Sequence, residues 1–270
     1  MAERPLTPSA HETEAPAQPF ESAPAGAENV RPYNDDEAKG RQVEQMFDSI
    51  APAYDFMNTA MTFGLHRYWR RVALRRIRTA IDGRRVLDIA TGTGDLPLYI
   101  LRHYSPDAVC GADLSSGMLA VARRKAERLP EALRNRLTLQ EADCLDLPFA
   151  DESFDTITVA YGVRNFERLA QGYAEMYRVL APGGTLCVIE LAEPANPIVR
   201  ALYRVYARTL IPFVGRMISG DSRAYTYLPQ SIAAAPQRDA MTALMTRAGF
   251  RSATWRTLTL GVVAIYIATK

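Results

Sequence analysis

A glycine-bearing turn is the clearest candidate for chemistry in this sequence. Residues 85–90 are apolar enough to form a buried strand, Thr91-Gly92-Thr93-Gly94 follow it, and a helical pattern begins at Asp95. Glycine adopts positive φ and lets the backbone pass close to a ligand. Asp88, near the strand end, can attract a cation or accept a hydrogen bond from an amine. A plain structural turn of an α/β fold would fit the same residues.

This turn differs from the one that binds dinucleotides. The pattern Gly-x-Gly-x-x-Gly, which holds a pyrophosphate on the N–H groups of a helix, does not occur here. Asp95 would repel a phosphate, and it would suit a ligand that carries positive charge. An NAD-dependent oxidoreductase is therefore disfavoured.

Acidic residues also end the next two predicted strands. Asp113 lies about 20 residues after the glycine turn, where carboxylates of doubly wound sheets bind a ribose diol. It would equally cap the helix that follows Ser115, and the two roles are compatible. The third strand ends near Asp143 and Cys144, where a carboxylate beside a small side chain can accept a hydrogen bond from the amino group of adenine. Ligands of open α/β sheets bind beyond the carboxyl ends of the strands, so these groups predict one nucleoside-binding edge.

Alternating strands and helices must position these residues. The predicted strands are 85–90, 108–113, 137–141, 154–161, 185–191, 252–259 and 262–268. The predicted helices are three runs within 36–81, then 95–103, 115–129, 166–180 and 239–248. The last two strands are joined too tightly for a crossover, which makes them antiparallel. We therefore expect an α/β fold: a Rossmann-like, doubly wound, mostly parallel seven-stranded sheet with an antiparallel last strand and a helical N-terminal extension.

Composition excludes several classes of protein. Three widely spaced cysteines form neither a disulfide framework nor a metal-ligand pattern, which favours a reducing cytoplasm. No apolar run reaches the roughly 18–20 residues of a membrane span, and the N-terminus lacks the apolar core of a secretion signal. Residues 1–35 are rich in Pro and Ala and carry a net charge of −4, which predicts a disordered acidic tail. Since the whole chain carries +2, residues 36–270 carry +6.

Taken together, these motifs resemble two nested families. The class I S-adenosylmethionine-dependent methyltransferases are matched by residues 86–95, Gly111-Ala112-Asp113, Asp143 and the turn at 178–184. The quinone-biosynthesis C-methyltransferases are matched from about residue 40 to the end. That narrower resemblance rests on Phe47-Asp48-Ser49-Ile50-Ala51-Pro52, Tyr54-Asp55, Met57-Asn58, Gly64, Trp69-Arg70-Arg71 and Tyr161-Gly162-Val163-Arg164-Asn165-Phe166. Thr91 departs from the pattern, because many relatives carry glycine there.

The resemblance implies a role for each residue on the cofactor side. Asp88 and Gly92-Thr93-Gly94 would lie near the methionine moiety of S-adenosylmethionine, with Thr93 in contact with it. Asp113 would bind the ribose. Asp143 and Cys144 would bind the adenine, and Ala160 would contribute at the end of the fourth strand. The methyl donor is the implied cofactor, and no metal is implied because the donor itself supplies the electrophile.

The narrower family methylates the ring of demethylmenaquinol or of a polyprenyl benzoquinol. A quinol ring carbon becomes nucleophilic when a phenol loses its proton, so the protein needs a base or a cation that lowers the pKa of the phenol. We expect Arg164 to stabilise the phenolate and Asn165 to bind the second quinol oxygen; a surface salt bridge is the alternative for Arg164. Tyr54 would cover the cofactor or orient the ring. His66 is a candidate base, although a lone histidine beside a helix start is more often structural.

A prenylated quinol resides in the bilayer, so the protein must reach a membrane. Residues 197–215 predict an amphipathic helix. Its apolar positions recur at helical spacing, namely Ile198, Val199, Leu202, Tyr203 and Tyr206, and its arginines lie four residues apart, namely Arg200, Arg204 and Arg208. The apolar run Leu210-Ile211-Pro212-Phe213-Val214 follows. We expect a cytoplasmic protein that associates peripherally with the anionic inner face of the cell membrane. The alternative is a lid helix packed on the core. The expected divisions are 36–82 as cover, 83–191 as cofactor-binding core, 192–236 as lid or membrane-facing insertion, and 237–270 as a helix with a strand pair.

The leading interpretation is a C-methyltransferase that converts demethylmenaquinol to menaquinol. Alternatives are the 2-methoxy-6-polyprenyl-1,4-benzoquinol reaction of ubiquinone biosynthesis, another small-molecule methyltransferase, and a cofactor-binding module without catalysis. No Asn-Pro-Pro-Tyr run follows the fourth strand, which disfavours methylation of nucleic acid and leaves RNA as a minor alternative. We therefore expect no nucleic-acid partner, and a homodimer is compatible with the sequence.

Overall fold

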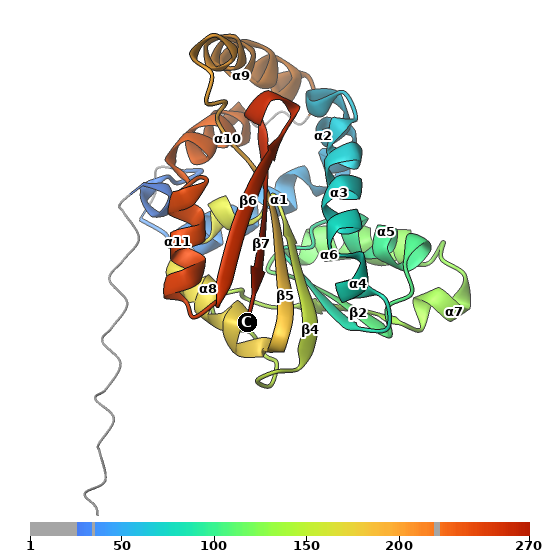
Figure 1. Ribbon diagram of the computed structural model, residues 1–270. Coiled ribbons are helices and arrows are strands. Elements are labelled where there is room, and N and C mark those ends of the chain that lie inside the picture. Colours follow the sequence, from blue (N-terminus) through green and yellow to red (C-terminus); the bar gives the residue numbers. More distant parts are fainter. Residues whose placement is uncertain (1–25, 34–35, 219–221) are drawn as a thin grey trace, which may run out of the picture.

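The computed structural model describes residues 26–33, 36–218 and 222–270. The described residues contain one seven-stranded sheet in the order β3-β2-β1-β4-β5-β7-β6 (Figure 1). Its strands are β1 (Arg85–Ile89), β2 (Ala108–Asp113), β3 (Leu137–Glu141), β4 (Phe154–Ala160), β5 (Leu180–Leu191), β6 (Ser252–Leu258) and β7 (Val263–Thr269). Strands β1 to β5 run parallel, and β7 is antiparallel to both of its neighbours. The predicted fold class is confirmed.

Helices cover both faces of this sheet and the carboxyl ends of its parallel strands. They are α1 (Lys39–Ile50), α2 (Tyr54–Thr62), α3 (Leu65–Arg76), α4 (Arg78–Ile81), α5 (Asp95–His103), α6 (Ser116–Ala126), α7 (Glu131–Arg134), α8 (Leu169–Val179), α9 (Pro197–Ile218), α10 (Ser222–Ala234) and α11 (Asp239–Arg247). Short 3₁₀ turns lie at Ala27–Asn29, Ala51–Ala53, Val163–Asn165 and Thr259–Gly261. Helices α8 and α11 pack on one face, and α3 to α6 pack on the other (Figure 1).

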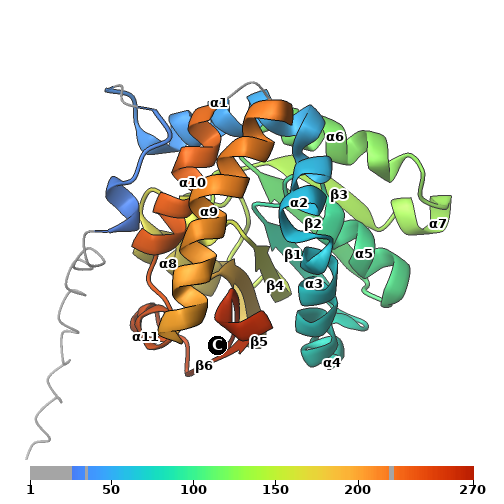
Figure 2. The same ribbon diagram turned by 90° about the horizontal axis from the view of Figure 1, so that it is seen from above.

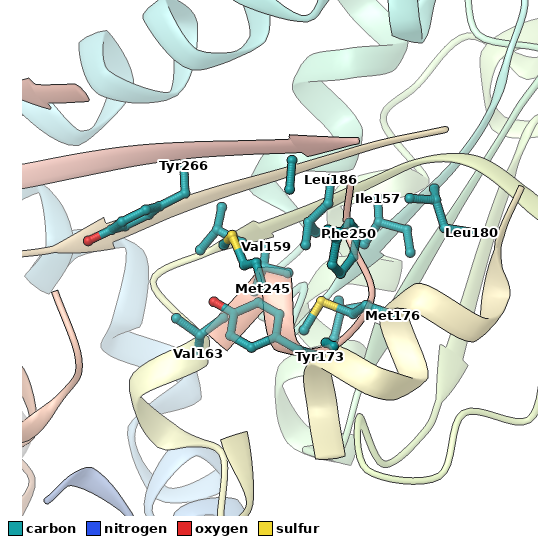
Figure 3. Close-up of a cluster of buried hydrophobic side chains, with 14 of the residues drawn as sticks. Ile157, Val159, Val163, Tyr173, Met176, Leu180, Leu186, Met245, Phe250 and Tyr266 are labelled. Carbon is teal, nitrogen blue, oxygen red and sulfur yellow. The ribbon is translucent and has the colours of Figure 1, made fainter. Parts of the chain in front are cut away.

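Strand alternation builds the two halves of the core. Leu87 and Ile89 of β1 face the α8–α11 side, whereas Val86 faces the α3–α5 side. Figure 3 shows the first of these clusters, in which Tyr173 and Met176 of α8 pack against Val159 and other strand side chains. Each such fully buried apolar side chain stabilises the fold by about 1.5–3 kcal/mol. The sheet is therefore a rigid base for residues at its strand ends.

A third cluster lies above the carboxyl ends of the strands. It joins α1, α2, α6, α9 and α10 through buried side chains that include Met46, Met57, Met118, Ala207 and Tyr227. Figure 2, which looks down on this end, shows α2 beside α9 over the sheet. The N-terminal helices and the α9–α10 pair thus form a cover over the edge where the sequence predicts a ligand.

The structure differs from the predicted elements in several places. Strand β5 already starts at Leu180, and its register shifts between Leu180 and Thr185, so the predicted turn Pro182-Gly183-Gly184 lies inside an irregular strand. The helix predicted over 166–180 begins only at Leu169, and helix α10 was not predicted. Within the part of the chain that is described, no helix combines the length and hydropathy needed to cross a bilayer.

Part of the predicted N-terminal tail contacts the core. Residues 26–33 were assigned to the tail, but Glu28 Oε1 accepts a hydrogen bond from the Leu169 backbone N–H at 3.1 Å. This contact ties the segment to the first turn of α8. Residues 1–25 and 34–35 of the predicted tail lie outside the described residues.

Candidate active site

Asp113 fastens the glycine turn to the next helix. Gly92 and Gly94 both have positive φ, at 55° and 76°. Asp113 Oδ2 accepts a hydrogen bond from the Gly92 N–H at 2.7 Å, and Oδ1 accepts one from the Ser115 N–H at 2.9 Å. Burial raises the pKa of Asp113 to about 6. The Ser115 hydroxyl in turn caps α6 by accepting from the Met118 N–H at 3.0 Å.

Asp88 supports the same turn from inside the sheet. Its side chain is buried, and its two oxygens accept hydrogen bonds from the Thr91 and Thr158 hydroxyls at 2.6 Å each. Burial raises the pKa of Asp88 to about 7, against the lowering effect of the two threonines. Thr91, the departure from the family pattern, is therefore a partner of Asp88.

A cleft of about 110 Å³ opens beside the turn at the carboxyl ends of the strands. Five of the predicted cofactor residues line it: Gly92, Asp113, Asp143, Cys144 and Ala160. The other three, Asp88, Thr93 and Gly94, are not among its lining residues. The cleft therefore brings together Asp113, which ends β2, and Asp143, which follows β3, with one glycine of the turn.

Thr93 and Gly94 have contacts elsewhere that explain their placement. The Thr93 hydroxyl donates to Asp55 Oδ1 at 2.5 Å, which joins the turn to α2. A Cβ added at Gly94 would lie 2.9 Å from the Ala122 Cβ, so this glycine lets α5 and α6 approach closely. Both residues hold the shape of the turn.

Asp95 is already neutralised by neighbouring cations. It pairs with Arg70 at 3.0 Å and forms a second, shorter ion pair with Lys125. Burial raises the pKa of Asp95, but the lowering effect of these two cations together is larger. The pKa of Asp95 is therefore below its ordinary value. Contrary to the prediction, Asp95 does not favour a cationic ligand, because its charge is balanced within the protein.

The residues of the cleft fit S-adenosylmethionine. A Cβ at Gly92 would lie 4.0 Å from Tyr54 Cε1, so a side chain there would extend toward a ring that lines the cleft. The carboxylates of Asp113 and Asp143 can accept hydrogen bonds from ribose hydroxyls and from an adenine amine. Leu114 and Met118 supply apolar contact for a flat ring. These acceptors and apolar side chains thus match a nucleoside.

A second, larger cavity of about 250 Å³ adjoins this cleft. Phe47, Tyr54, Tyr161 and Asn165 line both spaces and form a shared wall. All four residues predicted on the substrate side line the second cavity, namely Tyr54, His66, Arg164 and Asn165. Its remaining lining is mostly apolar and comes from α1, α2, α3, α9 and α10. Ligands in the two spaces would therefore meet at the shared wall.

Arg164 is a buried cation held by a buried carboxylate. Its side chain is 7% exposed, and Nη1 lies 2.9 Å from Glu190 Oε1. The Arg164 N–H donates to Glu190 Oε2 at 3.2 Å, and Nη1 also donates to the Tyr161 carbonyl. Burial alone would lower the pKa of Arg164, but Glu190 raises it above its ordinary value. The surface salt bridge considered for Arg164 is therefore wrong.

Glu190 was missed by the sequence reasoning. It is 2% exposed near the end of β5. The available signal was a single acid within an otherwise apolar run at residues 186–191. A buried charge needs a partner, which the sequence alone did not identify.

Asn165 and His66 also have defined partners. The Tyr227 hydroxyl donates to Asn165 Oδ1 at 3.2 Å. His66 Nδ1 lies 2.7 Å from the Thr62 hydroxyl. Burial, together with the charge of Arg70, lowers the pKa of His66 to about 4. His66 is therefore neutral at pH 7 and only a weak base.

Three more polar residues fix the cover to the core. Asp48 Oδ1 accepts from the Ser115 hydroxyl at 2.5 Å and the Gly117 N–H at 2.9 Å, which docks α1 on α6. Asp55 Oδ2 lies 2.8 Å from Lys125 Nζ. Lys39 Nζ donates to the carbonyls of Arg164 and Phe166 at 3.4 and 3.3 Å, and burial lowers its pKa to about 8. The acids of the 47–55 motif thus act in assembly of the site.

No metal centre is evident in the described ranges: no three His, Cys, Asp or Glu side chains gather there in a way that could hold an ion. Cys144 lies in the cleft, whereas Cys110 and Cys187 are buried within the sheet.

Comparisons with known proteins agree on the kind of protein that the chain resembles. Residues 35–270 match the ubiE/COQ5 methyltransferase family. A demethylmenaquinone methyltransferase of Porphyromonas gingivalis is 46% identical over 244 residues, which cover 90% of this chain and 98% of that protein. A Geotalea daltonii protein named ubiquinone/menaquinone biosynthesis C-methyltransferase UbiE is 42% identical over 233 residues, which cover 86% of this chain and 97% of that protein.

A solved structure shares the fold at much lower identity. Phosphoethanolamine N-methyltransferase 2 of Haemonchus contortus, in complex with phosphomonomethylethanolamine and S-adenosylhomocysteine, aligns with a TM-score of 0.60 at 17% identity. The alignment covers 83% of this chain and 58% of that chain. At this identity the likeness shows the fold alone.

Proposed function

The chain belongs to the ubiE/COQ5 methyltransferase family, and we propose from this premise that it transfers a methyl group from S-adenosylmethionine to the ring of demethylmenaquinol. The observation that carries the substrate assignment is the shared wall. It joins a cleft suited to a nucleoside with an apolar cavity that contains a buried guanidinium. An apolar cavity with few polar groups suits a prenylated aromatic ring.

On the cofactor side, the protein orients the donor without reacting itself. S-Adenosylmethionine supplies a methyl group that is activated by a sulfonium. Asp113 binds the ribose and Asp143 the adenine, while Gly92 lets the backbone come close. Asp88 acts through Thr91 and keeps the turn in place. Fixing both reactants at the wall converts a bimolecular encounter into an oriented one, which lowers the barrier.

On the substrate side, Arg164 stabilises the phenolate form of the quinol. A guanidinium in a low-dielectric cavity lowers the pKa of a nearby phenol more strongly than it would in water. Glu190 holds the guanidinium in place, and Asn165, anchored by Tyr227, binds the second quinol oxygen. Tyr54 lies on the wall between ring and cofactor. His66 is a weak base in this cavity, because its pKa is about 4.

The test is methyl transfer by the purified protein. Demethylmenaquinol and the matching 2-methoxy-6-polyprenyl-1,4-benzoquinol are each offered with isotopically labelled S-adenosylmethionine, and the quinones are analysed by mass spectrometry. The second substrate is included because the Geotalea daltonii relative is named for both pathways. We expect label in menaquinone. Absence of label from it, together with a normal quinone profile in cells lacking the protein, would refute the proposal.

We further propose that a membrane surface delivers the substrate. The apolar rim consists of exposed side chains from α2, α3, the turn between them, α9 and the β6–β7 turn: Phe56, Phe63, Leu65, Ile198, Leu202, Val205 and Leu260. Phe63 and Leu65 also line the second cavity, so the cavity reaches this end. Figure 1 shows α9, α2 and the β6–β7 turn at the same end of the molecule. Such a rim around a lipid-binding cavity suits an acyl-chain surface.

The positive charge that attracts an anionic membrane comes from α3 more than from α9. Arg67 and Arg71 are exposed on α3, close in sequence to Phe63 and Leu65. In the predicted stripe of α9, Arg200 donates to the Pro194 and Ala195 carbonyls and Arg204 pairs with Glu193 at 3.3 Å. The side chains of Arg208 and of residues 210–214 lie outside the described residues. We therefore expect α3 to provide the attraction to anionic lipid.

Vesicle co-sedimentation tests this second proposal. The combined change Phe63→Ser and Leu260→Ser removes two large apolar groups from the rim, and we expect binding to anionic vesicles to fall at least tenfold. Leu133→Ser on α7, at the far edge in Figure 1, serves as the control and should bind as before. Equal binding of the rim variant and the unaltered protein, or binding that ignores anionic lipid content, would contradict the proposal.

A further inference from the structure

Two buried polar atoms of residues that line the second cavity have no hydrogen-bond partner. Among the described residues, only Tyr161 Oη and Arg164 Nε are side-chain polar atoms of this kind. An unsatisfied buried donor is costly, and native structures contain few of them. Both residues line the second cavity, and Tyr161 lines the cleft as well. Their occurrence together points to a ligand atom that completes their hydrogen bonding.

The backbone at Tyr161 is strained in a way that fixes the ring. Its φ is 62°, in the left-handed region that non-glycine residues rarely adopt. The Tyr161 N–H donates to the Ile189 carbonyl at 2.7 Å, which anchors this conformation to β5. The following residue is equally constrained, since a Cβ at Gly162 would lie 2.6 Å from the Ala90 Cβ. Such strain is found mainly where it positions a functional group.

Arg164 and Tyr161 are held together as one unit. The Arg164 Nη1 contacts both the Tyr161 carbonyl and Glu190 Oε1, so that edge of the guanidinium is occupied. The Nε–H is left without an acceptor. Burial raises the pKa of the Tyr161 hydroxyl, so it keeps its proton at neutral pH and can donate. Two donors without acceptors therefore belong to residues that line the second cavity, and one of these residues, Tyr161, is part of the shared wall.

We propose that the Tyr161 hydroxyl and Arg164 Nε donate to one and the same quinol oxygen, next to the ring carbon that receives the methyl group. This inference rests on the proposed function. In the step concerned, the phenolic O–H bond breaks, its electron pair stays on the oxygen, and the proton passes to solvent water. Two donors on one oxygen stabilise the anion more than one does, and they fix which ring carbon faces the cleft. Tyr161 is thus a substrate-binding catalytic residue.

Ionisation of a bound phenol provides the first test. The absorption spectrum of 1-naphthol changes when it loses its proton, so its titration midpoint can be followed on the protein loaded with S-adenosylhomocysteine. We expect the midpoint of bound 1-naphthol to lie below that of the free compound. In Tyr161→Phe it should rise by about one to two pH units, the effect of one hydrogen bond to a charged acceptor.

Tyr173→Phe is the matched control. It removes one hydroxyl from an equally buried tyrosine, whose Oη bonds to Met241 Sδ at 3.0 Å away from both cavities. We expect its 1-naphthol midpoint to equal that of the unaltered protein. An unchanged midpoint in Tyr161→Phe, or failure of the unaltered protein to bind 1-naphthol, would overturn the proposal.

Turnover separates this inference from the proposed function. With demethylmenaquinol, Tyr161→Phe should lose about 10- to 100-fold in kcat, and the rise of kcat with pH should move to higher pH. Its affinity for S-adenosylmethionine, measured by calorimetry, should stay within threefold. Full kcat with menaquinol as product would defeat the role of Tyr161 and leave the function intact. A shifted 1-naphthol titration without methylation of demethylmenaquinol would defeat the function and leave the phenolate site intact.

Discussion

Replacing Asp88 by asparagine should change how the stability of the protein depends on pH. The carboxyl group of Asp88 is buried in the sheet, where the Thr91 and Thr158 hydroxyls donate hydrogen bonds to its oxygens. Asparagine has nearly the same shape and carries no charge at any pH. The substitution therefore removes the titration and keeps most of the packing.

The expected magnitude follows from the pKa. Asp88 titrates at about 7 in the folded protein, against an ordinary value of 3.8. Between these values the folded protein holds a proton that the unfolded chain does not, so the contribution to stability is complete below about pH 4. It is lost as the pH rises through about 7. At about 1.4 kcal/mol per pH unit, the loss over roughly three units amounts to about 4 kcal/mol.

Urea unfolding at pH 5, 6, 7 and 8 measures this effect. The unaltered protein should lose stability with rising pH more steeply than Asp88→Asn, and the difference should level off above about pH 7.5. A difference in the free energy of unfolding that stays the same at every pH would reflect altered hydrogen bonding only. Asp107→Asn makes the same chemical change at an exposed position and should follow the unaltered curve. Parallel pH profiles for Asp88→Asn and the unaltered protein would refute the reasoning.

Three further substitutions address the site and its support. Arg164→Lys keeps the charge but loses the planar guanidinium that contacts Glu190. We expect kcat to fall about 100-fold, while the affinity for S-adenosylmethionine, measured by calorimetry, changes less than threefold. Equal losses of kcat and of this affinity would remove the catalytic assignment of Arg164. Gly94→Ala places a methyl group 2.9 Å from the Ala122 Cβ at positive φ, and thermal unfolding should report a loss of about 1–3 kcal/mol; an unchanged melting temperature would contradict that packing. Asp113→Asn should weaken S-adenosylmethionine binding about tenfold by calorimetry, and an unchanged affinity would exclude the ribose contact.

Much of the fold was predictable because its signals are local. Apolar runs of strand length, helical periodicity and glycines at a turn depend on neighbouring residues, and they predicted all seven strands and the antiparallel end of the sheet. The errors lie where a local pattern is ambiguous. Pro182-Gly183-Gly184 is typical of a turn, yet pairing with β4 on both sides of it makes the segment part of β5.

The cofactor side of the site was partly predictable from the sequence for the same reason. Asp113 ends a parallel strand and Asp143 follows one, and the carboxyl ends of such strands meet at one edge of the sheet. The sequence could not distinguish a residue that lines the cleft from one that supports it. Asp88 and Thr93 are close to Gly92 in sequence, but the sheet and α2 direct their side chains to partners outside the cleft.

By itself, the sequence determined which strands form and which end of the sheet carries the acids, since both follow from short-range periodicity and from the conformations that glycine permits. Only the tertiary structure decided which charges are already balanced and which donors are left for a ligand. Asp95 meets Lys125 and Arg164 meets Glu190 across 30 and 26 residues of chain, and Tyr161 comes to border two cavities because α2 and α10 close over the sheet. Burial and electrostatic pairing depend on distances in space, which no local pattern of residues encodes.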